Sequence, residues 1–84
     1  MRISQEGIEI TNRFFEAIQY LRNEKIIRGL GTFTREFDIN RWNMVTVRDN
    51  PHRAILKPEW IYYLHKSYNV SVRWIITGQG KIIE

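Results

Sequence analysis

Apolar residues recur at steps of three and four in the first third of the chain, which is the spacing of one face of an α-helix. The series consists of Ile10, Phe14, Ile18 and Leu21. Thr11 is a residue type that caps helix N-termini. The pattern therefore predicts a helix over about residues 11–24, capped by Thr11, with its apolar face in the core.

The centre of the chain predicts two short helices around a tight turn. Their inward positions, spaced three or four residues apart in each helix, are Phe33 and Phe37, then Met44 and Val47. Asp38 can adopt the left-handed conformation that such a turn needs, and Ile39 fills its corner. Asn40 then caps the second helix, which covers about residues 40–48.

Residues that start and stop helices predict two more helices in the C-terminal half. Pro58 stands at a first helical position with Glu59 behind it, and an apolar series continues this helix to residue 68. Ser71 caps a final short helix over residues 72–77. Gly78 closes that helix in the left-handed conformation.

Strand signals are weak by comparison. Period-two alternation is confined to residues 70–72, and the tail over residues 81–83 offers only weak pairing. A chain of 84 residues supports one modest core. The sequence therefore predicts an all-α fold of five short helices, which form a single domain over residues 1–84.

Composition narrows the classes of function. The chain has no cysteine, which excludes disulfides and thiolate metal sites and favours an intracellular protein. No signal peptide or membrane span is indicated, so a cytoplasmic location is expected. His52 and His65 have no partner at metal-ligand spacing, and residues 78–81 lack the spacing of a phosphate loop. No enzyme, metal, cofactor or small-molecule substrate is predicted.

The excess positive charge lies in the middle of the chain. The protein carries 13 Lys and Arg against 9 Asp and Glu, a net charge of +4. Residues 22–57 hold eight of these cations and four of the acids, and the difference of four accounts for the whole excess. Such a concentration is typical of a surface that binds a polyanion, and a merely solubilising surface is the alternative.

Residues 40–48 also carry side chains suited to base recognition. With Met44 and Val47 turned inward, the outward set is Arg41, Trp42, Asn43, Thr46 and Arg48. Arginine pairs with guanine and asparagine with adenine through two hydrogen bonds each, and threonine contacts a base methyl group or a phosphate. The combination predicts a helix-turn-helix that binds double-stranded DNA.

The sequence resembles the lambda-repressor-like (Cro/repressor-type) helix-turn-helix family, especially its phage-repressor-type regulators. The resemblance covers most of the chain, and the family's apolar positions are occupied by Ile27, Phe33, Phe37, Ile39, Met44 and Val47. The more specific match is the ending over residues 68–80, which has an aromatic residue, a capped short helix with Trp, and a Thr-Gly-x-Gly close. Leu30, Thr34 and Asp38 depart from the Gln, Ala and Gly that are usual there.

The resemblance implies a compact five-helix domain that binds double-stranded DNA sequence-specifically as a transcriptional regulator, a repressor of phage or mobile-element type. Residues 40–48 would lie in the major groove, and the protein would be nucleoid-associated when bound. The base-contacting residues would be Arg41, Trp42, Asn43 and Thr46. A homodimer on a near-palindromic site is also implied. Candidate dimer contacts are Tyr62, Tyr63 and the tail at residues 82–83.

Phosphate contacts are predicted for a set of polar and basic residues near the motif. The set is Arg48, Asn40, Lys25, Arg28, Arg35, Arg53 and Lys57. Taken singly, a surface cation needs no such role, and only the set is meaningful. The competing interpretation is a helical protein-interaction module that has the same fold, binds no DNA and makes its contact through Trp42.

Overall fold

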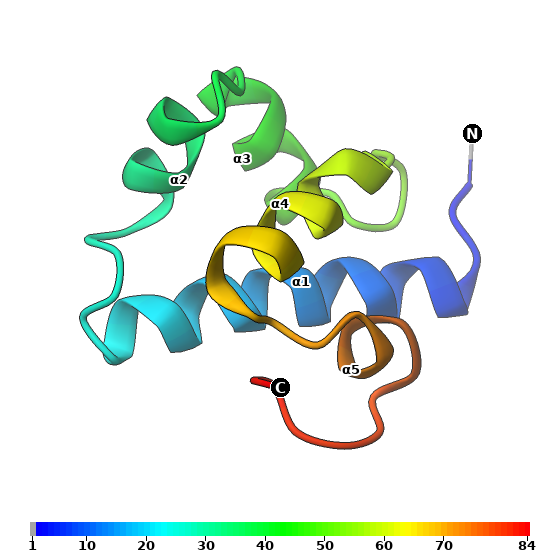
Figure 1. The fold of residues 1–84 in the computed structure, drawn as a ribbon. Helices are drawn as coiled ribbons and strands as arrows, with labels where there is room; N and C mark the ends of the chain where they lie inside the picture. Colours follow the sequence, from blue (N-terminus) through cyan, green and yellow to red (C-terminus); the bar gives the residue numbers. More distant parts are fainter. Residues whose placement is uncertain (1) are drawn as a thin grey trace.

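Helix α1, Gln5–Asn23, runs across the molecule, with α2 and α3 together on one side of it and α5 on the other (Figure 1). The computed structural model describes residues 2–84. The remaining helices are α2 (Leu30–Glu36), α3 (Arg41–Asp49), α4 (Pro58–Tyr68) and α5 (Val72–Thr77). Residues 2–84 form no β-strand beyond one isolated bridge, so the predicted all-α class and its five helices are confirmed. No helix in this range is long and apolar enough to cross a bilayer.

The start of α1 differs from the sequence prediction. The Ser4 hydroxyl accepts a hydrogen bond of 3.1 Å from the Gly7 amide, so the helix begins at Gln5. Acidic Glu6 in the first turn also favours this start, because it interacts with the positive end of the helix dipole. Thr11 lies inside the helix and is only 2% exposed, so its assignment as the cap was wrong.

The core receives side chains from all five helices. Its buried apolar residues are Phe14, Ala17, Ile18, Leu21, Ile27, Phe33, Met44, Val47, Trp60, Leu64, Val70, Trp74 and Ile75. Of the predicted inward residues, Phe33, Met44 and Val47 are therefore in the core. Phe37 is half-buried against the core, as is Ile39.

A chain of aromatic contacts holds α2 between α1 and α4. The ring centroids of Phe14 and Phe33 are 6.0 Å apart, and those of Phe33 and Phe37 are 5.0 Å apart. Phe37 then stacks on Tyr63 with centroids 4.6 Å apart and planes 2° apart. Such pairs add stabilisation beyond the area they bury. The turn that follows Phe37 is thereby fixed against α4.

The turn between α2 and α3 forms as predicted. Asp38 has a left-handed backbone, with φ 53°, and the Ile39 amide donates a hydrogen bond of 2.8 Å to the Thr34 carbonyl. The Asn40 side chain caps α3 by accepting a hydrogen bond of 3.1 Å from the Asn43 amide. Backbone conformation, loop hydrogen bond and cap together set the direction in which α3 leaves α2.

The C-terminal segment is closed onto the fold by polar contacts. Ser71 caps α5 through the Trp74 amide, and Gly78 ends it with φ 77°, as predicted. Arg13 of α1 supplies an additional cap by donating to the carbonyls of Ile75 (2.7 Å) and Ile76 (2.9 Å). The tail pairs with the segment before α5 through one isolated bridge, Val70–Ile83. Beside this bridge, the Ser71 amide donates a hydrogen bond to the Ile82 carbonyl.

We expect Met44→Ala to lower the free energy of unfolding by about 2–5 kcal/mol, because it opens a cavity beneath α3. Met44 is 0% exposed, whereas Trp42 on the same helix is 78% exposed. Trp42→Ala is the matched control and should change stability by no more than about 0.5 kcal/mol. Urea unfolding followed by circular dichroism measures both. Equal losses in the two variants would contradict the orientation of α3.

Tyr68 joins α4 to α2, because its hydroxyl donates a hydrogen bond to the Glu36 carboxylate. Burial, then this hydrogen bond and the negative charge of Glu36, raise the pKa of Tyr68 to about 12 from its usual 10.0. As the pH rises, the unfolded chain therefore loses this proton first. The contribution of this raised pKa to the free energy of unfolding is complete below pH 10.0. It disappears as the pH approaches about 12.

Tyr68→Phe should therefore show a smaller fall in the free energy of unfolding than the wild type between pH 10.0 and about 12. Tyr62→Phe, a change at a tyrosine that is 52% exposed, should keep the wild-type dependence. Urea titrations at closely spaced pH values measure the difference. A Tyr68→Phe profile that overlays the wild type would show that folding does not raise the pKa of Tyr68.

Candidate nucleic-acid interface

Helix α3 presents a polar outer face, and few of its residues are buried. Its inward residues are Met44 and Val47, and its nine residues span about 14 Å at about 1.5 Å each. The residues predicted to face outward, Arg41, Trp42, Asn43, Thr46 and Arg48, are all exposed. A helix of these dimensions fits the major groove of B-DNA, which is about 12 Å wide.

The exposed side chains of α3 point in three directions. At about 100° per residue, Trp42 and Thr46 point away from the core. Arg41 and Arg48 lie seven positions apart, and both border a hollow shared with α2. Asn43 lies on the opposite flank and borders a cleft shared with α4. The outer face is therefore bounded by arginine on one side and by a mixed polar cleft on the other.

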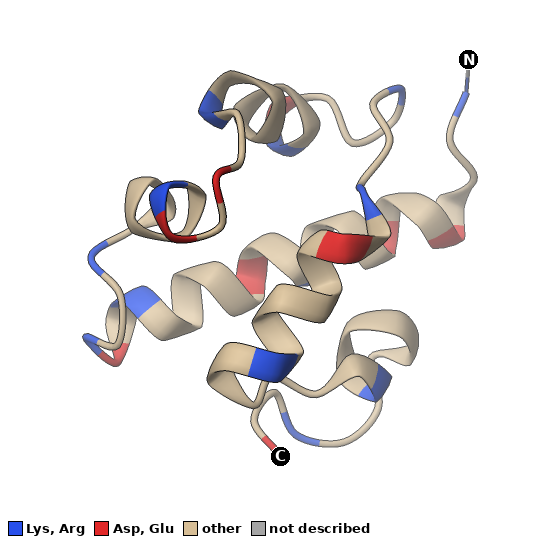
Figure 2. Ribbon diagram, turned by 45° about the horizontal axis from the view of Figure 1, so that its top comes forward, with Lys and Arg blue, Asp and Glu red and all other residues tan. Residues whose placement is uncertain are grey.

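The hollow beside α2, which we call the arginine hollow, gathers side chains that are distant in sequence. Its volume is about 380 Å³, and its lining includes the segment at residues 29–32, where α2 begins. Figure 2 shows Lys and Arg segments from the end of α1, the connection to α2, α2 itself and α3 on this side of the molecule. The arginines that line the hollow are Arg22, Arg28, Arg35, Arg41 and Arg48.

The positive charge of the arginine hollow is largely uncompensated. Within residues 2–84, the side-chain ion pairs are those of Arg13, Arg48 and His65. Arg48 lies 3.1 Å from Asp49, while the other four arginines of the hollow have no acidic partner in this range. Guanidinium groups are fork-shaped donors suited to phosphate oxygens, so the hollow can hold a polyanionic backbone.

The structure brings together only part of the predicted phosphate-contacting set. Arg28, Arg35 and Arg48 line the arginine hollow. Lys25, Arg53 and Lys57 do not line it, although all three are exposed. The side chain of Asn40 serves the α3 cap.

The two cations that follow α3 lie elsewhere. Arg53 donates a hydrogen bond of 3.1 Å to Asn50, which belongs to the same loop. Lys57 borders the cleft that Asn43 shares with α4. Any phosphate contact from these two residues would therefore be made outside the arginine hollow.

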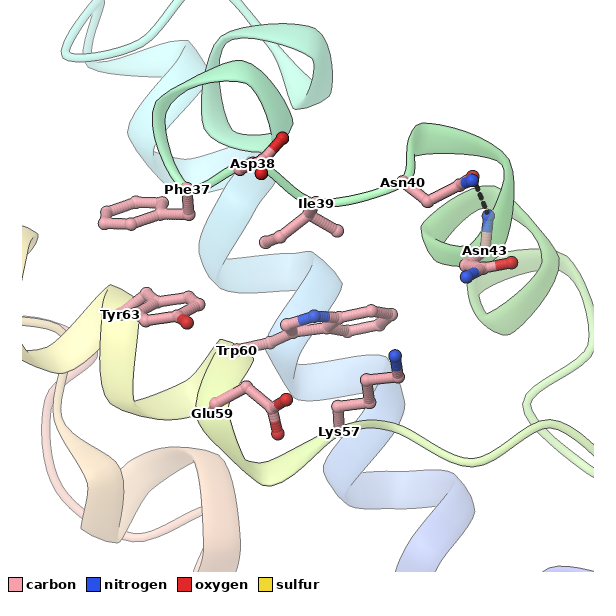
Figure 3. A pocket seen from close by; sticks show the side chains of 9 residues that line it. All are labelled: Phe37, Asp38, Ile39, Asn40, Asn43, Lys57, Glu59, Trp60 and Tyr63. Atoms are coloured by element: carbon pink, nitrogen blue, oxygen red, sulfur yellow. Dashed lines mark hydrogen bonds between the residues drawn. The ribbon is translucent and has the colours of Figure 1, made fainter.

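The cleft of about 290 Å³ between the turn and α4 is chemically different (Figure 3). Figure 3 shows Phe37 lying over Tyr63 and Ile39 directed toward Trp60, so its floor is aromatic. Asp38 and Glu59 add two acids to its lining. Carboxylates repel phosphate, so this flank favours a DNA backbone less than the arginine hollow does.

Arg22 belongs to the site although sequence reasoning did not assign it a role. It lies in the last turn of α1, and the fold carries it to the hollow formed by α2 and α3. Its charge contributes to the positive excess over residues 22–57, which is the only sequence signal that points to a role for it. The periodicity of α1 identifies which face is buried but not which later helix meets its end.

The chemistry that this surface offers is charge and hydrogen-bond donation. Residues 2–84 contain no group of three or more His, Cys, Asp or Glu side chains that could hold a metal ion. The exposed donors of α3 and the arginines beside it suit a nucleic acid. Its phosphates accept hydrogen bonds, and its base edges carry the sequence information. Comparisons with protein-family models, curated proteins and solved structures found no match to this chain.

Proposed function

We propose that the chain is a sequence-specific double-stranded DNA-binding domain of the lambda-repressor-like helix-turn-helix type, acting as a transcriptional repressor. The observation that carries this proposal is the continuity of two surfaces. The exposed polar face of α3 adjoins the arginine hollow, and Arg41 and Arg48 belong to both. A reading helix beside a phosphate-binding strip is the arrangement that duplex recognition needs.

Base reading falls to the first half of α3. Arg41, Trp42 and Asn43 are exposed there, and Thr46 follows one turn after Trp42. Asp49, at the far end of the helix, is exposed as well, and its carboxylate disfavours a nearby phosphate. The N-terminal half therefore enters the groove more deeply, with Arg41 able to pair guanine and Asn43 adenine.

Arg41→Ala and Asn43→Ala should each weaken binding to the preferred duplex by about 1–3 kcal/mol and relax the preference at one base position. Arg28→Ala is the contrast, because this arginine lines the arginine hollow and the loss of a phosphate contact should weaken all sequences alike. Selection from a random duplex pool gives the preferred site, and fluorescence anisotropy then measures affinity for that site and its single-base variants. Uniform losses from all three variants would refute the base-reading assignment.

Arg35→Ala should reduce the slope of log affinity against log salt by about 1, because one fewer counterion is released. Arg73→Ala is the matched control, since this exposed arginine lies on α5 and bonds to Gln79. Its slope should equal that of the wild type. Identical slopes for wild type and Arg35→Ala would show that the arginine hollow does not contact phosphate.

A protein-interaction module is the second candidate, and the exposure of Trp42 favours it. Trp42 is 78% exposed in the first turn of α3, and tryptophan is enriched at binding hot spots. A contact centred on Trp42 would depend little on salt, whereas a DNA complex weakens steeply as salt rises. Failure to retain any duplex from the random pool at low salt would favour this second function.

A further inference from the structure

The polar outer face of α3 carries apolar groups along its centre. Trp42 is 78% exposed, and Val45 and Thr46 follow it after three and four positions, which is the spacing of neighbours on a helix surface. Val45 is partly exposed, and it is not among the half-buried apolar residues that pack against the core. These three residues form what we call the outer strip, which consists of an indole and the methyl groups of valine and threonine.

The fold makes no use of the outer strip. The buried contacts of α3 come from Met44 and Val47 on its inner side. At about 100° per residue, Trp42 lies almost opposite the midpoint of these two residues, with Val45 and Thr46 on either side of it. Exposed apolar groups gain free energy when a partner removes them from water. The strip is therefore suited to a partner that offers apolar groups of its own.

The hydrogen-bonding residues of α3 lie on the two flanks of the strip. Arg41 and Arg48 border the arginine hollow, and Asn43 borders the cleft shared with α4. Under the proposed function, the outer face of α3 is turned toward the base pairs. The strip then meets the middle of the groove floor, and polar recognition occurs on both sides of it.

Only one of the four DNA bases presents an apolar group in the major groove. Guanine, cytosine and adenine show hydrogen-bond donors or acceptors there, whereas thymine shows one acceptor and a methyl group. An apolar side chain placed over a polar base edge leaves that edge without a hydrogen-bond partner, which costs free energy. Over a thymine methyl group, the same side chain excludes water from two apolar surfaces. The strip therefore favours thymine.

We infer that Trp42, Val45 and Thr46 recognise methyl groups in the major groove, so that the preferred duplex has thymine at two neighbouring base pairs. This inference rests on the proposed function and specifies the chemistry of the DNA site. From Trp42 to Thr46 the helix rises by about 6 Å, at about 1.5 Å per residue. Successive bases are about 3.4 Å apart along a strand, so the strip faces about two base pairs.

The same contact accepts a modified base. Cytosine methylated at the ring carbon that bears the methyl group of thymine presents the same apolar group at the same place in the groove. Replacing a thymine by this methylated cytosine should therefore retain part of the affinity that unmethylated cytosine loses. Methylation of a cytosine beneath the strip strengthens binding rather than blocking it.

Uracil tests the contact directly, because it differs from thymine only by lacking this methyl group. The preferred site is first selected from a random duplex pool, and each of its thymines is then replaced singly by uracil. Fluorescence anisotropy should show the affinity falling about fourfold at each of the two positions beneath the strip, which is the loss expected for one buried methyl group. Uracil elsewhere in the site should have little effect.

Trp42→Ala should lower the affinity for the selected site and bring the ratio of thymine to uracil affinity close to one at one of the two positions. Val45→Ala should reduce this ratio by a smaller amount. Arg41→Ala is the matched control, because it removes a hydrogen-bonding residue of the same turn and should leave the ratio as in the wild type. Circular dichroism confirms that each variant is folded.

Several outcomes would overturn the inference and leave DNA binding in place. They are a selected site without neighbouring thymine pairs, affinity that uracil leaves unchanged at every thymine, and cytosine methylation without effect. An unchanged ratio in Trp42→Ala would overturn it as well, because another residue would then recognise the methyl groups. A wild type that retains no duplex from the pool would instead refute the proposed function itself, together with the inference that rests on it.

Discussion

The stack of Phe37 on Tyr63 is the contact on which the position of α3 depends. Phe37 is the last anchored residue before the turn, and its ring lies 4.6 Å from that of Tyr63 on α4. Through Phe33, the same chain of aromatic rings reaches Phe14 on α1. The turn therefore departs from a fixed point on two helices. The direction of α3 is then set by the left-handed Asp38 and the Asn40 cap.

This anchoring explains how so short a helix can present so much polar surface. A helix of nine residues is marginal in water by itself, since isolated helices shorter than about 12–15 residues lack sufficient stabilisation. Here Met44 and Val47 supply the buried contacts, and Asn40 supplies the cap. Stability is thus confined to the inner face and the first turn, and the side chains of the outer face stay exposed.

Local chemistry made much of this fold predictable from sequence. Asn40, Ser71 and Gly78 act over a few residues, so their roles as caps and stops could be read directly. The beginning of α1 could not, because Ser4 and Thr11 are both good caps and only tertiary packing buries Thr11. The arginine hollow depends on which helix ends meet. Periodicity shows that a face is buried but not against what.

The two surfaces at opposite ends of α1 place different demands on the same helix. The arginines of the hollow repel one another, and under the proposed function phosphates would offset that cost by neutralising them. The second surface is an apolar groove beside the start of α1, with Ile3, Ile10 and Ile76 in its lining. It has no charge to neutralise, so a contact there would gain only by excluding water from the isoleucines. Salt should therefore weaken a contact at the first surface and leave one at the second almost unchanged. Because α1 is continuous from Gln5 to Asn23, its length fixes the separation of the two surfaces.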